Sequence, residues 1–154
     1  MKLNSQTVQE ELKKLGFGYE VIELSESTHT AVDAANALNC SIAQIAKSII
    51  FKSESNNPIL IIASGINRVD EKIIEEEIGE RVGRADVDFV LEKTGFVIGG
   101  VPPIGHISSI QTFIDNDLLQ YEDIWAAAGN PRAVFKLKSK DLIEMVKGKF
   151  INLK

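Results

Sequence analysis

A glycine- and proline-rich loop, Gly99-Gly100-Val101-Pro102-Pro103-Ile104-Gly105-His106, constrains this chain more than any other stretch. Proline fixes φ and lacks an N–H, whereas glycine reaches positive φ and lets a ligand approach the bare backbone. The loop follows the apolar run 96–98, which predicts a buried strand. The amides expected to be free for a carbonyl oxygen or an oxyanion are those of Gly99, Gly100, Val101, Ile104, Gly105 and His106. The alternative is a tight turn between strands that binds nothing.

The length of 154 residues fits a single domain over residues 1–154 with one sizeable core. The longest apolar run, 59–63, is too short to span a bilayer. Residues 1–6 lack the apolar segment typical of a signal peptide. The single cysteine, Cys40, excludes an internal disulfide and fits a reducing compartment. We therefore expect a cytoplasmic protein without a membrane partner.

The formal net charge of −5 argues against non-specific binding of nucleic acid. The charge is uneven, because residues 132–154 carry seven Lys and Arg side chains against two acidic ones. That segment is therefore +5, and residues 1–131 are −10. A basic segment of this kind either contacts a phosphate backbone or forms a solvated face.

Apolar residues at helical spacing, flanked by capping residues and glycines, predict the helices. They are a first helix from residue 4 or 5 to 15, then 31–38, a short one at 41–46, 69–78, 87–93 and 142–146. Thr30 with Asp33, and Ser41 with Gln44, have the spacing of capping boxes.

Short apolar or alternating runs predict strands at 18–24, 48–52, 59–63, 96–98, 110–114, 123–127 and 133–137. Asn56-Asn57 joins 48–52 to 59–63 as a hairpin. Helices lie mostly in the first two thirds and at the end, with hairpin-like strands between them. This order favours an α/β fold of the α+β type, a mixed sheet or barrel flanked by helices, over repeated βαβ units.

Few residues have the spacing of a known catalytic or metal site. His29, His106 and Cys40 lie too far apart in sequence for a zinc motif, and no phosphate-cradling glycine motif or nucleophile elbow is present. We therefore expect no metal, no cofactor and no covalent nucleophile. Lys47, between apolar neighbours at the expected join of the short helix and strand 48–52, is either a snorkelling edge residue or a cation turned into a pocket.

Several stretches together resemble the YbaK/prolyl-tRNA synthetase-associated editing domains. They are 30–35, 44–52, 99–106, 114–115 and 124–129, and they follow the family's order over almost the whole chain. The sequence Gly-Gly-Val-Pro-Pro-Ile-Gly-His at 99–106 is most similar to the stand-alone ProX-like branch, which clears mischarged prolyl-tRNA.

The resemblance implies a mostly antiparallel, barrel-like β-sheet surrounded by helices. It also implies hydrolysis, in trans, of the ester between a wrong amino acid and tRNA. The implied partners are the charged acceptor end of tRNA and an aminoacyl-tRNA synthetase, and the chain is a monomer or a homodimer. The implied catalytic residues are Lys47, Gly100 and His106. The implied substrate-binding residues are Thr30, Ser48, Gly99, Val101, Pro103, Gly105, Asp115 and Gly129.

The residues themselves leave simpler alternatives, in which His106 is a loop imidazole bonded to backbone and Asp115 begins a turn. One departure bears on the substrate: some family members that clear cysteine carry an acidic residue near the position of Val134, which is apolar here. This departure argues against specificity for cysteine and leaves alanine as the alternative, so the expected substrate is Ala- or Cys-tRNA(Pro). A non-catalytic module that binds a small ligand or a synthetase is the rival function, and its binding depends less on salt than tRNA binding does.

Overall fold

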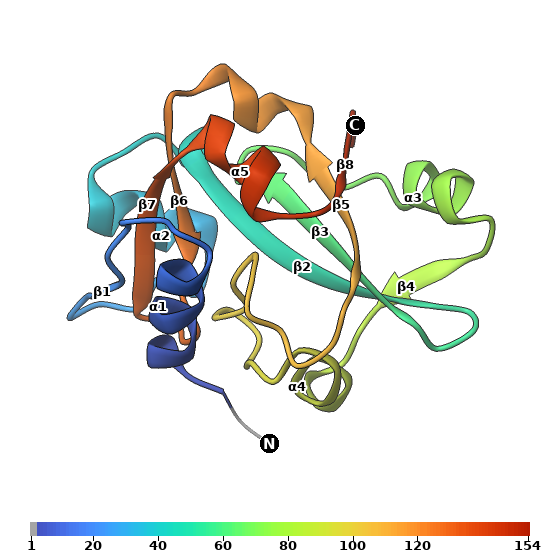
Figure 1. Cartoon of the computed structure of the whole chain (residues 1–154). Helices are drawn as coiled ribbons and strands as arrows, with labels where there is room; N and C mark the ends of the chain where they lie inside the picture. Colours follow the sequence, from blue (N-terminus) through green and yellow to red (C-terminus); the bar gives the residue numbers. More distant parts are fainter. Residues whose placement is uncertain (1–2) are drawn as a thin grey trace.

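The computed structural model describes residues 3–154, which form one eight-stranded sheet with five α-helices around it (Figure 1). The helices are α1 (Ser5–Lys14), α2 (Ala31–Leu38), α3 (Glu71–Ile78), α4 (Val87–Thr94) and α5 (Ser139–Met145). The strands are β1 (Ile22–Glu23), β2 (Ile45–Ser53), β3 (Pro58–Ser64), β4 (Val82–Arg84), β5 (Gln111–Asp115), β6 (Asp123–Ala127), β7 (Ala133–Lys138) and β8 (Lys149–Ile151). Two 3₁₀ turns, Ile42–Gln44 and Asn116–Gln120, precede β2 and follow β5.

The strands run in the order β1-β7-β6-β2-β3-β5-β8, and β4 pairs with β2 beside this path. Four pairings are antiparallel (β1 with β7, β6 with β7, β2 with β3 and with β4), and three are parallel. The fold class expected from the sequence is confirmed, a mostly antiparallel mixed sheet surrounded by helices. In Figure 1, β2 and β3 cross the middle of the molecule, and α3 lies at its right-hand side near β4.

Both faces of the central hairpin are covered, which explains the uninterrupted apolar run of β3. Leu60 and Ile62 belong to the large core cluster that also takes in residues of α1, α4 and α5. Ile59 and Ile61 belong to a second cluster, which includes Ile74 of α3. Successive side chains of a strand point to opposite faces, so a strand buried on both sides loses the alternating pattern.

Most predicted elements are confirmed, and the exceptions have local causes. The predicted strand 96–98 is wrong: Phe96 is buried, but Val97 begins a turn closed by the Gly100 N–H to Val97 C=O hydrogen bond. The predicted strand 18–24 shrinks to β1. There the side-chain amide of Gln9 donates to the Tyr19 carbonyl and accepts from the Val21 amide. These two backbone groups are therefore not available for hydrogen bonds to a neighbouring strand.

The expected short helix at 41–46 is a single 3₁₀ turn, and β2 already begins at Ile45. The capping box of Ser41 and Gln44 is present, but it closes only this one turn. Lys47 consequently lies inside a strand, not at its start. The short strands β4 and β8 were not predicted from the sequence. Between residues 3 and 154, no helix has both the length and the apolar character needed to cross a bilayer.

Candidate functional site

The middle of β2 has a partner strand on one edge only. Along one edge, β2 pairs with β3 from Ala46 to Lys52. Along the other edge, β6 pairs with Ile45 and Ala46, and β4 pairs with β2 only from Phe51 onward. Residues 47–50 therefore form an open edge between the ends of β6 and β4, and a pocket lies there.

This pocket has a volume of about 370 Å³. Its walls are mostly small or aliphatic side chains from α2, β2, β6 and the glycine loop, such as Ala34, Ala126 and Val101. The polar residues of its lining are Thr28, His29, Thr30, Lys47, Ser48, Arg84 and Trp125. No carboxylate of residues 3–154 takes part in the lining. The pocket thus favours a small ligand that is neutral, or one that has a negatively charged group close to Lys47 and Arg84.

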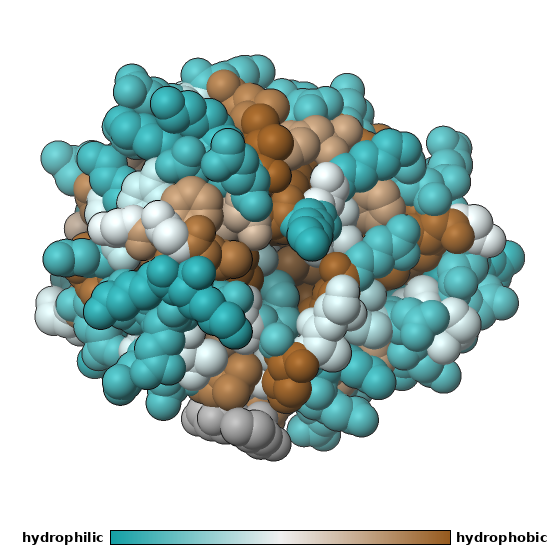
Figure 2. Space-filling model, viewed as in Figure 1, coloured by the Kyte–Doolittle hydropathy of each residue, from teal (hydrophilic) through white to brown (hydrophobic). Residues whose placement is uncertain are grey.

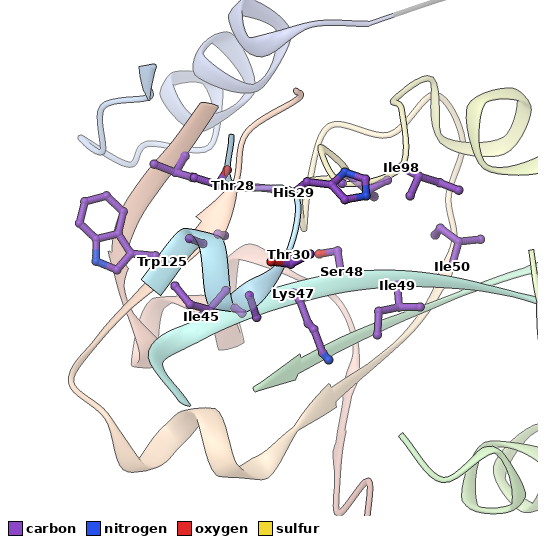
Figure 3. Close-up of a pocket in the computed structure, with 18 of the residues that line it drawn as sticks. Thr28, His29, Thr30, Ile45, Lys47, Ser48, Ile49, Ile50, Ile98 and Trp125 are labelled. Carbon is purple, nitrogen blue, oxygen red and sulfur yellow. The ribbon is translucent and has the colours of Figure 1, made fainter. Parts of the chain in front are cut away.

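Strand alternation separates the functional side chains of β2 onto two faces. In Figure 3, Ser48 and Ile50 point toward His29, Thr30 and Ile98, whereas Lys47 and Ile49 point to the opposite side of β2. The Ser48 hydroxyl is the one buried side-chain polar atom of residues 3–154 without a hydrogen-bond partner. A buried hydroxyl without a partner costs about 1–3 kcal/mol, which a ligand that hydrogen-bonds to it recovers.

The two cations of the pocket lie on the Lys47 side of β2. Arg84 is directly opposite Phe51 in the β2–β4 ladder, and opposite residues share a face, so its side chain is on the same face as Lys47 and Phe51. Burial, reinforced by the positive charge of Arg84, lowers the pKa of Lys47. Neither cation belongs to a salt bridge within residues 3–154. Lys47 and Arg84 therefore form a basic pair on that face of β2. A second cavity lies there, and its lining also includes Arg68 and Lys72 and the carboxylates Asp70, Glu71 and Glu75.

The glycine loop contributes only its first part to the pocket. Gly99 and Val101 line it, and Gly99 has a φ of +88° with the imidazole of His29 packed against it. The expectation that the Gly100 amide is free is wrong, because this N–H donates to the Val97 carbonyl over 3.0 Å. The Gly100 carbonyl in turn accepts from the Gly129 amide over 2.8 Å. Gly100 and Gly129 thus fix the loop and stand outside the pocket lining of the described chain.

The second part of the loop faces a different cavity, which is lined by Pro103, Gly105 and His106 together with residues of α1 and α5. Figure 2 views the face that carries α1 and α5 in Figure 1, and it shows hydrophobic side chains around a hollow near the middle of that face. The His106 ring nitrogen Nε2 lies 2.7 Å from the Pro102 carbonyl, and the ring stands edge-on to Phe96. Burial lowers the pKa of His106. The structure does not bring His106 and Lys47 together.

Asp115 is 1% exposed and holds backbone and side-chain donors of neighbouring segments. Its carboxylate accepts from the Ser64 amide at 3.0 Å, the Asn67 side chain at 2.7 Å and the Asp117 amide at 2.9 Å. It ties the end of β3 to the end of β5, and it is not part of the pocket lining within residues 3–154.

Of the residues expected at the site, Lys47, Thr30, Ser48, Gly99 and Val101 line one pocket. Sequence reasoning missed His29 and Arg84 as members of this pocket. His29 precedes the helix cap Thr30, whose hydroxyl accepts from the Asp33 amide, and that adjacency could have indicated it. Arg84 ends a three-residue strand with no sequence signal. Among residues 3–154 no group of three His, Cys, Asp or Glu side chains could hold a metal ion.

Comparison with known proteins identifies the family. The family model of the aminoacyl-tRNA editing domain matches residues 25–145. This chain belongs to that family. The matched segment contains all five of the expected site residues that line the pocket and the two additional ones, His29 and Arg84.

The relatives of this editing domain agree with the assignment. The crystal structure of a candidate trans-editing enzyme for prolyl-tRNA synthetase is 39% identical with a TM-score of 0.92, and the match covers 100% of this chain and 98% of that one. The uncharacterized protein YwhH of Bacillus subtilis is 32% identical over 81% of this chain and 80% of its own length. EbsC of Enterococcus faecalis, a candidate Cys-tRNA(Pro)/Cys-tRNA(Cys) deacylase, is 23% identical over 84% and 79%. The family and these relatives support aminoacyl-tRNA editing as the general class of activity.

Proposed function

We propose that this chain is a trans-editing deacylase that hydrolyses the ester of mischarged tRNA, with Ala- or Cys-tRNA(Pro) as the substrate. The observation that carries the proposal is the basic pair of Lys47 and Arg84 at the border of a pocket whose own lining contains no carboxylate. A charged acceptor end presents a small aminoacyl group and a terminal phosphate close together. The pocket walls suit the first, and the basic pair of Lys47 and Arg84 suits the second.

In the proposed reaction, a water molecule attacks the ester carbonyl carbon and a tetrahedral oxyanion forms. The bond to the ribose oxygen then breaks, and the free amino acid and the tRNA hydroxyl are released. The amides of Gly99 and Val101 have no acceptor in the described chain and are available to the oxyanion. One such donor is typically worth about 3 kcal/mol of barrier. The pocket lining offers no carboxylate as general base. We therefore assign the proton transfer to the neighbouring free ribose hydroxyl of the substrate, which accepts a proton from the attacking water while it passes its own proton to the departing ribose oxygen.

Selection of the amino acid follows from the size and polarity of the walls. Ala31, Ala34, Ala126 and Ala127 leave room for a small side chain, and Val134 is apolar. Pocket size alone discriminates by only about 10–200-fold per methylene group, so a small side chain such as that of Ala or Cys is accepted and a larger one is excluded sterically. The other residues expected at the site do not contact the substrate in this proposal; they maintain the conformation of the glycine loop and the sheet. They are Gly100, Pro103, Gly105, His106, Asp115 and Gly129.

The test is the release of amino acid from Ala-, Cys- and Ser-charged tRNA(Pro) by the wild type, Lys47→Met and Lys52→Met. Lys52 is a matched control, because it lies on the same strand and its ammonium stands 5.2 Å over the Phe89 ring. We expect Lys47→Met to lose most of the activity and Lys52→Met to keep it. A folded wild type that releases none of the three amino acids would favour a non-catalytic module that binds a small ligand or a synthetase.

A further inference from the structure

The open edge of β2 carries three backbone groups without a strand partner. The Ile45 carbonyl accepts from the Gly65 amide, and the Ser53 amide donates to the Asn57 carbonyl, so the odd-numbered residues of β2 bond to β3. The Glu54 amide donates to the Arg81 carbonyl, so the even-numbered residues face the other edge. Backbone groups of successive strand residues point to alternate edges.

The registers of the flanking strands define where pairing stops. The parallel pairing of β6 ends at Ala46 with Ala126, and the antiparallel pairing of β4 begins at Phe51 with Arg84. Within the described chain, this leaves the Ser48 N–H, the Ser48 C=O and the Ile50 N–H unpaired. Residues 47–50 span about 13 Å at a strand rise of about 3.3 Å per residue. A ligand that pairs with these groups therefore has to present backbone-like donors and acceptors over the length of a short strand.

We propose that the aminoacyl group of the substrate fills this gap as a single strand residue, paired antiparallel with Ser48. This inference rests on the proposed function and names how the amino acid is held. An aminoacyl ester has the amine, α-carbon and carbonyl of a backbone residue. Its amine donates to the Ser48 carbonyl, and the Ser48 amide donates to the ester carbonyl.

The side-chain geometry agrees with this pairing. Residues directly opposite in an antiparallel pair share a face of the sheet, so the amino-acid side chain lies on the face of Ser48. That face is toward Thr30 in Figure 3, next to the unpartnered Ser48 hydroxyl. The ribose and phosphate then leave along the edge and reach Lys47 and Arg84 on the other face.

The first experiment changes the substrate and leaves the protein intact. Alanyl-, lactyl- and propionyl-tRNA(Pro) differ only at the α-position, which carries an amine, a hydroxyl donor or no donor. Each enzymatic rate is divided by the spontaneous hydrolysis rate of the same ester. Because the propionyl ester has no donor, we expect its normalised kcat/KM to be about tenfold or more below that of the alanyl ester. The lactyl ester, which has a hydroxyl donor, should lie between the two. Equal normalised rates for alanyl and propionyl esters would overturn the pairing and leave the deacylase function standing.

The second experiment observes the edge directly by amide hydrogen exchange in ¹⁵N-labelled protein. In the free protein we expect the Ser48 and Ile50 amides to exchange fast and the Lys47 and Ile49 amides, which face β3, to exchange slowly. Alanine linked through an amide to 3′-amino-3′-deoxyadenosine then protects Ser48 and leaves Ile50 unchanged. An unprotected Ser48 amide at saturating analogue overturns the pairing. Protection without any deacylation of charged tRNA upholds the pairing and overturns the proposed function instead.

Discussion

The backbone of Gly100 packs directly against the backbone of Asn130: a Cβ on Gly100 would stand 2.5 Å from the Asn130 Cα. The two chain segments lie thirty residues apart in sequence and are also joined by the Gly129 to Gly100 hydrogen bond. This contact holds the first part of the glycine loop, and with it Gly99 and Val101, against the end of β6.

Gly100→Ala is therefore expected to lower the free energy of unfolding by about 1–3 kcal/mol, the usual cost of overpacking a tight contact. Urea denaturation measures this change. Gly18→Ala is the matched control, because a Cβ at Gly18 meets no atom within 4 Å. Equal free energies of unfolding for both variants would show that the close contact between the loop and Asn130 does not contribute to the stability of the fold.

Lys47→Met is expected to stabilise the fold while it removes activity. Burial and the nearby Arg84 lower the pKa of Lys47, so at pH 7 the folded protein holds this charge at a cost. That cost is present below the lowered pKa and disappears as pH rises toward the unfolded value of 10.5. We expect a gain at pH 7 of about 1 kcal/mol at most, or about 2–4 °C in Tm, because part of the charge is screened by solvent.

Thermal unfolding at pH 7 and at pH 10 measures the effect, which should be smaller at pH 10. A Lys47→Met variant that melts below the wild type at pH 7 would contradict it. The Lys52→Met variant serves again as the control, since Lys52 lies on the same strand and is not part of the pocket lining.

Asp115→Asn is expected to destabilise the protein by about 2–3 kcal/mol, because an amide cannot accept all the donors that the buried carboxylate holds. Asp70→Asn provides the comparison: Asp70 caps α3 by accepting from the Lys72 amide, and asparagine caps a helix as well as aspartate does. Chemical denaturation of both variants decides the outcome. Full stability of Asp115→Asn combined with lost deacylation would assign Asp115 to substrate binding.

Tyr19→Phe is expected to cost about 1–2 kcal/mol at pH 7. The Tyr19 hydroxyl donates to the Asp141 carboxylate and accepts from the Lys138 amide, which joins the segment after α1 to the start of α5. Tyr121→Phe is the control, because the Tyr121 hydroxyl bonds to no side chain of residues 3–154.

Burial and the bond to Asp141 raise the pKa of Tyr19 above 10.0. The neutral hydroxyl therefore stabilises the fold fully below pH 10, and this contribution is lost as pH rises through the higher folded pKa. The stability difference between wild type and Tyr19→Phe should fall above pH 10. A difference independent of pH would show that the hydroxyl contributes only through packing.

The sequence by itself determined the elements whose signals are local. The caps Asn4, Thr30 and Ser41 act on amides two or three residues away, and Gly79 and Gly95 end helices in the left-handed conformation. Short apolar or alternating runs likewise located β2, β3, β5, β6 and β7 to within a few residues. The glycine loop and Lys47 were singled out because their residue types are unusual in their settings.

The tertiary structure decided which of these residues meet. Strand pairing depends on hydrogen bonds between segments far apart in sequence, so no local signal could show that β6 and β4 stop short of each other along β2. That gap leaves the Ser48 backbone without a strand partner. The pairing of β4 with β2 places Arg84 on the same face as Lys47, and the two parts of the glycine loop line two separate cavities. The residue types are a property of the chain, but the pocket exists only because the packed sheet leaves one strand edge unpaired.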